Sequence, residues 1–91
     1  MHERRVQRAL ERVHGTPLEF ARAQNLTVVM AARPCHIGTT RFYGRLEGTI
    51  ITVYPSEKNV DEVVAHEIYH WIDPEGPEEA ARLFASLWTG R

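Results

Sequence analysis

The stretch His66-Glu67-Ile68-Tyr69-His70 constrains this chain most, because on a helix its spacing serves a specific chemistry. Each helical residue advances about 100° and 1.5 Å, so histidines four residues apart lie on one side, roughly one turn apart. Two imidazoles placed in this way can bind one Zn²⁺ through bonds of about 2.0–2.1 Å. Glu67 cannot join them as a ligand, but its carboxylate can reach a water in an open coordination position and act as general base.

The residues around this motif predict the helix that the chemistry needs. Asn59 is a favourable N-cap residue, Glu62 follows three positions later, and Asp61 lies in the first turn. At helical spacing the apolar residues form one stripe, and both histidines lie at its border. We therefore expect the histidines to lie beside the core and to open onto a cleft. The residues of the stripe are Val60, Val64, Ile68 and Trp71.

Length and composition predict a single small domain that spans residues 1–91. The chain is 43% hydrophobic and 25% charged, which is ordinary for a globular protein with a modest core. Its net charge of −1 argues against nucleic acid or an anionic membrane as the main partner. No stretch approaches the roughly 18 apolar residues of a membrane span. Cys35 is the one cysteine and cannot form an internal disulfide, so we expect a cytoplasmic protein.

The order of the remaining patterns predicts the fold class. Helical periodicity comes first, β-branched stretches follow, and helical periodicity returns around the motif. Such segregation favours an α+β fold: a small, mostly antiparallel three-stranded sheet with helices packed on one face. A loop is expected at 33–38, and a tight turn at Glu47-Gly48. The predicted elements are helices at 3–14 and 16–24, strands at 26–31, 41–46 and 48–54, a helix from Asn59 through the motif, and a last helix from Pro77.

A catalytic zinc ion usually has three protein ligands and one open position, so a third ligand is expected after the motif. Asp73 lies about 10 Å along the axis from His66 and fits the end of the helix better. Glu75, in the turn, remains a candidate. In the last helix Glu79 borders the predicted apolar face, whereas Glu78 points nearly opposite to it, so Glu79 is the predicted ligand. That predicted face consists of Ala80, Leu83, Phe84, Leu87 and Trp88.

An HExxH helix followed by a Glu-bearing helix resembles the gluzincin metallopeptidases. More narrowly, residues 77–85, Pro-Glu-Glu-Ala-Ala-Arg-Leu-Phe-Ala, resemble the ExEANxFA helix of ImmA/IrrE-type peptidases, and the similarity covers about residues 48–88. The resemblance implies a zincin-like fold and a third zinc ligand at the glutamate that precedes the alanine, which is Glu79. Ala81 stands where that family has asparagine, and the interval from His70 to Glu79 is shorter than is usual there.

Together these patterns predict a zinc-dependent metallopeptidase that hydrolyses peptide or protein substrates. His66, His70 and Glu79 would hold Zn²⁺. Glu67 would take the proton of the attacking water and pass it to the leaving amine. The strand at 49–54 would bind the substrate backbone if it lay at the sheet edge.

The alternative is a non-catalytic zincin-fold module for regulation or protein interaction, with zinc structural or absent. The small size favours it, because little chain remains to wall a cleft, and a protein partner could complete that cleft. Closure of the fourth coordination position by Cys35 or His36 would indicate this alternative. Three tyrosines are candidate donors to an oxyanion in the catalytic case. They are Tyr43, Tyr54 and Tyr69.

Overall fold

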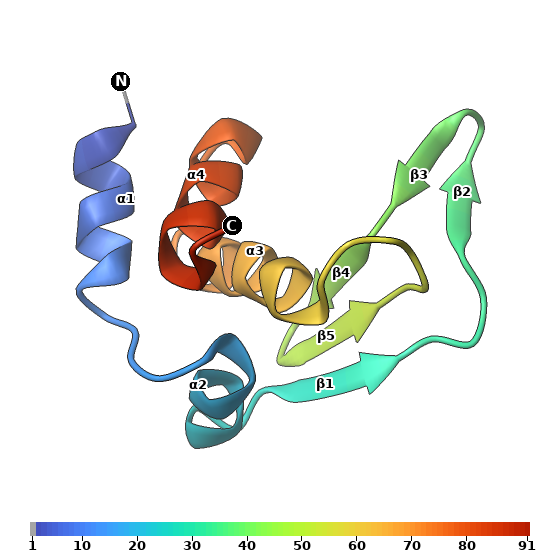
Figure 1. The fold of residues 1–91 in the computed structure, drawn as a ribbon, viewed down its shortest axis with the longest axis horizontal. Helices are drawn as coiled ribbons and strands as arrows, with labels where there is room; N and C mark the ends of the chain where they lie inside the picture. The colour runs from blue at the N-terminus through green and yellow to red at the C-terminus, as the bar shows by residue number, and fades with distance from the viewer. Residues whose placement is uncertain (1) are drawn as a thin grey trace.

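The computed structural model describes residues 2–91, and within them the chain forms four helices and five short strands (Figure 1). The helices are α1 (Glu3–Leu10), α2 (Pro17–Ala23), α3 (Val60–Ile72) and α4 (Glu78–Thr89). The strands are β1 (Thr27–Met30), β2 (Cys35–Ile37), β3 (Thr40–Phe42), β4 (Gly44–Glu47) and β5 (Ile50–Val53). The predicted α+β class is confirmed.

The main sheet has the strand order β1-β5-β4 and is mixed, which corrects the expectation of a mostly antiparallel sheet. The tight turn at Gly48, which has a φ of 61°, joins β4 and β5 into an antiparallel hairpin. The hairpin then docks through β5, so that β5 runs parallel to β1 with Thr27 opposite Ile50. Sequence periodicity does not encode this docking direction.

The region before β4 also differs from the prediction. Residues 33–38, expected as a loop, contain β2, and the strand expected at 41–46 is divided at Tyr43 into β3 and β4. β2 and β3 pair with each other as a separate antiparallel hairpin, with a turn at Gly38. We call residues 35–42 the β2–β3 arm; it extends away from the main sheet (Figure 1).

Helices α2 and α3 cover one face of the main sheet, and α1 and α4 pack beyond them. On β5 the side chains of Ile51 and Val53 are buried in a core cluster with residues of α2 and α3. Ile50, on the opposite face, is 46% exposed. This alternation follows from the two-residue period of a strand, and it fixes which face of the sheet supports α3.

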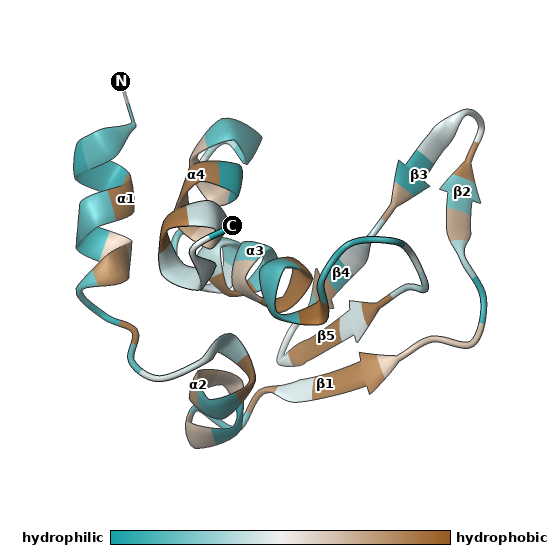
Figure 2. Cartoon of the chain, in the orientation of Figure 1, coloured by the Kyte–Doolittle hydropathy of each residue, from teal (hydrophilic) through white to brown (hydrophobic). Residues whose placement is uncertain are grey.

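Helix α3 belongs to both parts of the core. Its residues Val64 and Ile68 pack with α2 and β5, whereas its Tyr69 packs with α1 and α4. Figure 2 shows the apolar residues of α1 on the side that faces α4. The motif-bearing helix is therefore held from several directions, which gives the side chains that it presents a fixed frame.

The helix starts predicted at Asn59 and at residue 16 are present. The Asn59 side chain accepts hydrogen bonds from the backbone N–H groups of Asp61 and Glu62, and Thr16 and Glu19 form a reciprocal capping box. α1 ends at Leu10, earlier than predicted. Among residues 2–91 no helix is both long and apolar enough to cross a membrane.

Candidate metal centre

His66 and His70 lie on the uninterrupted 13-residue helix α3, as their spacing predicts. Their ring centroids are 5.1 Å apart. Both side chains are largely but not fully buried, with 22% and 21% of their surface exposed. The two imidazoles therefore form one edge of a site that is open to solvent on its other side.

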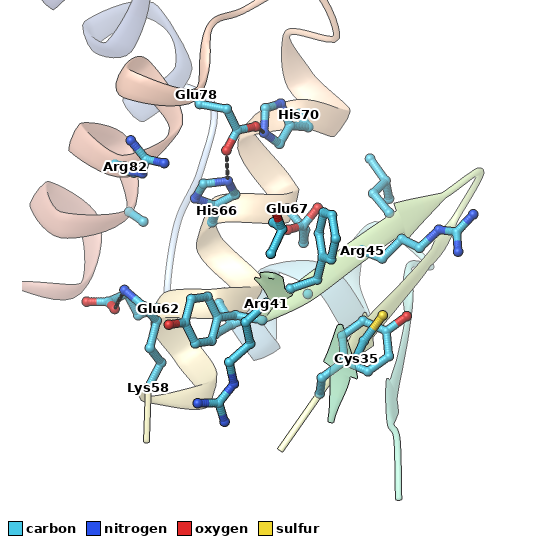
Figure 3. A pocket seen from close by; sticks show the side chains of 18 of the residues that line it. Cys35, Arg41, Arg45, Lys58, Glu62, His66, Glu67, His70, Glu78 and Arg82 are labelled. Carbon is cyan, nitrogen blue, oxygen red and sulfur yellow. Dashed lines mark hydrogen bonds and ion pairs between the residues drawn. The ribbon is translucent and has the colours of Figure 1, made fainter. Parts of the chain in front are cut away.

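Glu78, the first residue of α4, completes a cluster with these histidines (Figure 3). One oxygen of its carboxylate lies 3.0 Å from Nε2 of His66, and the other lies 2.6 Å from Nε2 of His70. The three donor atoms lie within 4.8 Å of one another. Tetrahedral zinc with bonds near 2.0 Å sets its ligand atoms roughly 3.3 Å apart, so small shifts would suffice to hold an ion.

Glu79, the predicted third ligand, does not face the histidines. Its carboxylate lies 3.4 Å from Nε2 of His2, and its side chain is 78% exposed. The predicted apolar face of α4 was wrong, since Leu83 and Leu87 are exposed whereas Ala81 and Ala85 are buried. This rotates the buried face by roughly 60° and places Glu78, instead of Glu79, at its border. The small alanines carry little hydrophobic signal in the sequence, yet they line the contact between α3 and α4.

The turn between α3 and α4 is fixed by a polar network that does not touch the cluster. The Tyr69 hydroxyl donates to Oδ2 of Asp73 at 2.9 Å, and Nε of Arg5 donates to the same oxygen at 2.7 Å. A Cβ at position 76 would lie 2.5 Å from Cε2 of Tyr69, so Gly76 permits this close turn. Asp73 caps the helix end as expected, and Glu75 is exposed outside the cluster.

The protonation preferences of the cluster suit a cation. Burial lowers the pKa of His66, and the nearby Glu78 carboxylate offsets this only in part, so the neutral, metal-binding imidazole is favoured. Burial raises the pKa of Glu78, but the two histidines outweigh it and leave that pKa lowered. The buried Nε2 of His70 lies close to the carboxylate without hydrogen-bond geometry. An unsatisfied ring nitrogen aimed at the other two ligands fits a metal site.

Glu67 is the one buried charged residue within residues 2–91, with 8% of its surface exposed. Burial, with a further contribution from the charge on Glu78, raises the pKa of the Glu67 carboxyl group to about 7. The group lies against Gly44 of β4, where an added Cβ would come within 3.3 Å of Oε2 of Glu67. A carboxyl group with a pKa near neutrality can both accept and release a proton. No pattern in the sequence indicates that Gly44 helps to enclose this carboxyl group.

A cleft of about 760 Å³ opens over the cluster. Its walls come from α3 and α4 on one side, and from β4 and the β2–β3 arm on the other. Cys35 lines the cleft, but neither it nor His36 belongs to the metal-capable group found among residues 2–91. Tyr43 and Tyr54 also line the cleft, whereas Tyr69 is fully buried.

Comparison with protein-family models, with curated proteins and with solved structures found no match for this chain. What the site can do therefore follows from its own geometry: three nitrogen and oxygen donors that converge at the floor of a cleft, beside a buried carboxyl group.

Proposed function

We propose that this protein is a zinc-dependent metallopeptidase with a zincin-like arrangement, in which His66, His70 and Glu78 hold the ion. The observation that carries the proposal is the convergence of the three donor atoms within 4.8 Å, with Glu67 buried in the same cleft. Two histidines and one glutamate are an established donor set for catalytic zinc.

The protein side of the mechanism rests on Glu67. When bound, zinc would polarise a substrate carbonyl and lower the pKa of a water, so that loss of a proton from this water would leave a strong oxygen nucleophile near neutral pH. Glu67 accepts the proton of that water as the oxygen adds to the carbonyl carbon, and then delivers the proton to the leaving nitrogen as the C–N bond breaks. The pKa of about 7 suits both steps, because the group gains and loses its proton at little cost near neutral pH.

Strand β4 is the proposed binding edge for an extended substrate. β5, which includes most of the stretch 49–54 expected to bind substrate, pairs on both sides and has no free edge. β4 pairs only with β5 in the main sheet, and Gly44, Arg45 and Leu46 line the cleft. Its free backbone groups can pair with a peptide laid across the cleft, as in β-augmentation.

Two observations favour catalysis over a non-catalytic module. The metal-capable cluster within residues 2–91 has three members, which leaves a fourth position for water. Glu67 is also kept buried at an electrostatic cost, which a structural metal site does not require. The chain itself supplies a far wall to the cleft through the β2–β3 arm; a protein partner that extends this wall remains part of the proposal.

Glu67→Gln tests the catalytic role. The substitution keeps the size of the side chain but removes the basic carboxylate, so zinc affinity should stay near that of the wild type. Hydrolysis in a peptide library with added Zn²⁺ should fall by about 10²–10⁴-fold.

Glu62→Gln, on the same helix and also lining the cleft, is the matched control and should retain activity. Full hydrolysis by Glu67→Gln would refute the general-base role. A Glu67→Gln variant that loses zinc binding would instead indicate that this residue is a ligand.

A further inference from the structure

Four cationic side chains line the cleft, and three of them already have partners. Arg41 contacts Glu57 at 3.2 Å and donates to the carbonyl of Pro55. The other two pairs are Arg45 with Glu47 at 3.3 Å, and Lys58 with Glu62 at 3.7 Å. Their charges are thus balanced locally before any substrate enters.

Arg82 is the exception. It lines the same cleft, is exposed, and has no hydrogen bond or ion pair within the part of the chain that the structure describes. It lies four residues after Glu78 on α4, so the two side chains share one side of the helix about 6 Å apart along its axis. Figure 3 shows Arg82 beside His66 and Glu78. The guanidinium is also close enough to act on His66 electrostatically.

A bound ion would sharpen this imbalance. Two acidic residues precede Arg82 on α4. Glu78 would be engaged by the ion, whose two positive charges it only partly cancels, and Glu79 lies outside the cleft with its carboxylate 3.4 Å from Nε2 of His2. The mouth of the cleft next to the site would then carry an unopposed guanidinium beside a cationic centre, which attracts and orients an anion. A planar guanidinium binds a carboxylate through two parallel hydrogen bonds, so the preference would be geometric as well as electrostatic.

We infer that Arg82 is a specificity-determining residue that binds a carboxylate of the peptide substrate within one or two residues of the bond to be cleaved. This inference rests on the proposed zinc site. The carboxylate belongs either to an acidic side chain or to the free C-terminus of a short peptide, and both present the same group to the guanidinium.

Binding of peptide hydroxamates to the zinc-loaded full-length chain tests this without requiring hydrolysis. Three probes share one backbone: the first has a glutamate side chain and a C-terminal amide, the second a glutamine and a free C-terminal carboxylate, and the third a glutamine and an amide. Calorimetry should show that the first or the second binds about 10-fold more tightly than the neutral third. Which of the two does so identifies the source of the carboxylate.

Arg82→Gln should abolish this preference while it leaves the affinity for zinc and for the neutral hydroxamate unchanged. Arg82→Lys, which keeps the charge but loses the bidentate geometry, should retain part of it. Arg22→Gln, on α2 and outside the cleft, is the matched control and should bind as the wild type does.

The outcomes separate the two proposals. Equal binding of all three probes to the zinc-loaded wild type, or a preference that persists in Arg82→Gln, overturns the role of Arg82 and leaves the metal site standing. A chain that binds no zinc, or a zinc-loaded chain that binds none of the hydroxamates, overturns the open metal site and this inference with it.

Discussion

The carboxyl group of Glu67 is held where its ionised form is poorly solvated, and this has a consequence for stability. Its pKa of about 7 in the folded protein exceeds the ordinary value of 4.5, so the native state binds more protons than the unfolded state between these values. The free energy of unfolding should therefore fall as the pH rises from about 4.5 to about 7. Above that range it should stay lower by the full amount.

Glu67→Gln should remove this cost. In chelator-treated protein the variant should be more stable than the wild type at pH 8, by on the order of 3 kcal/mol, with little difference at pH 4. Denaturant unfolding at the two pH values measures this. A stability difference of the same size at both would contradict an electrostatic origin, and Glu62→Gln controls for the general loss of a carboxylate on α3.

At the scale of elements, the packing of α3 against β4 depends on the absence of a side chain at position 44. A Cβ there would lie 2.6 Å from Cγ1 of Val63 and 3.3 Å from the carbonyl oxygen of Thr52. Gly44→Ala should therefore destabilise the protein by about 1–3 kcal/mol through overpacking. Thermal or chemical unfolding measures the loss.

A double-mutant cycle identifies the cause. Val63→Ala removes the methyl group that the new Cβ would meet, so Gly44→Ala should cost less in that background, with a coupling of roughly 0.5–3 kcal/mol. Strictly additive effects of the two substitutions would place the origin of the destabilisation elsewhere.

Some features of the helices could be predicted from the sequence, and others could not. The spacing of His66 and His70 and the Asn59 cap indicated where α3 lies and which side chains it presents, because both are local properties of a helix. The choice between Glu78 and Glu79 depended on which side of α4 packs on α3. Two buried alanines decide this side, and two exposed leucines had suggested the wrong one. The hydrophobicity of side chains is a poor guide to the buried face of a helix when two helices approach closely, because the close approach requires small residues such as alanine.

At the scale of the whole molecule, zinc should act as a stabilising ligand of the folded chain. At a free concentration 100 times its Kd, an ion that binds only the folded state adds about 2.7 kcal/mol, which raises the Tm of a domain of this size by roughly 10–20 °C. Glu79→Gln should show the same shift as the wild type, whereas Glu78→Gln should show little or none. Thermal unfolding with and without Zn²⁺ measures both, and equal shifts for the two variants would contradict the ligand assignment.

For the strands too, local features could be predicted from the sequence, whereas the pairing of distant strands could not. The strand content of residues 26–54 and the turn at Gly48 follow from β-branched stretches and from glycine. That β5 inserts between β1 and β4, and that residues 35–42 leave the sheet as a hairpin of their own, depends on contacts between distant parts of the chain. The periodicity of a single stretch predicts neither the position of β5 in the sheet nor the separate hairpin.

All three proposed metal donors come from one short segment, in which His66 and Glu78 are only 12 positions apart. Closing so short a loop costs little chain entropy, so the α3–α4 hairpin could hold an ion while other parts of the chain fluctuate. The surroundings of Glu67 are assembled differently, since Gly44 arrives from a strand more than twenty residues earlier. If the proposed function holds, metal affinity would depend mainly on this short segment, whereas catalysis would depend on the whole assembled chain. Under mild denaturation, or as mutations accumulate, hydrolysis should be lost first and zinc binding later.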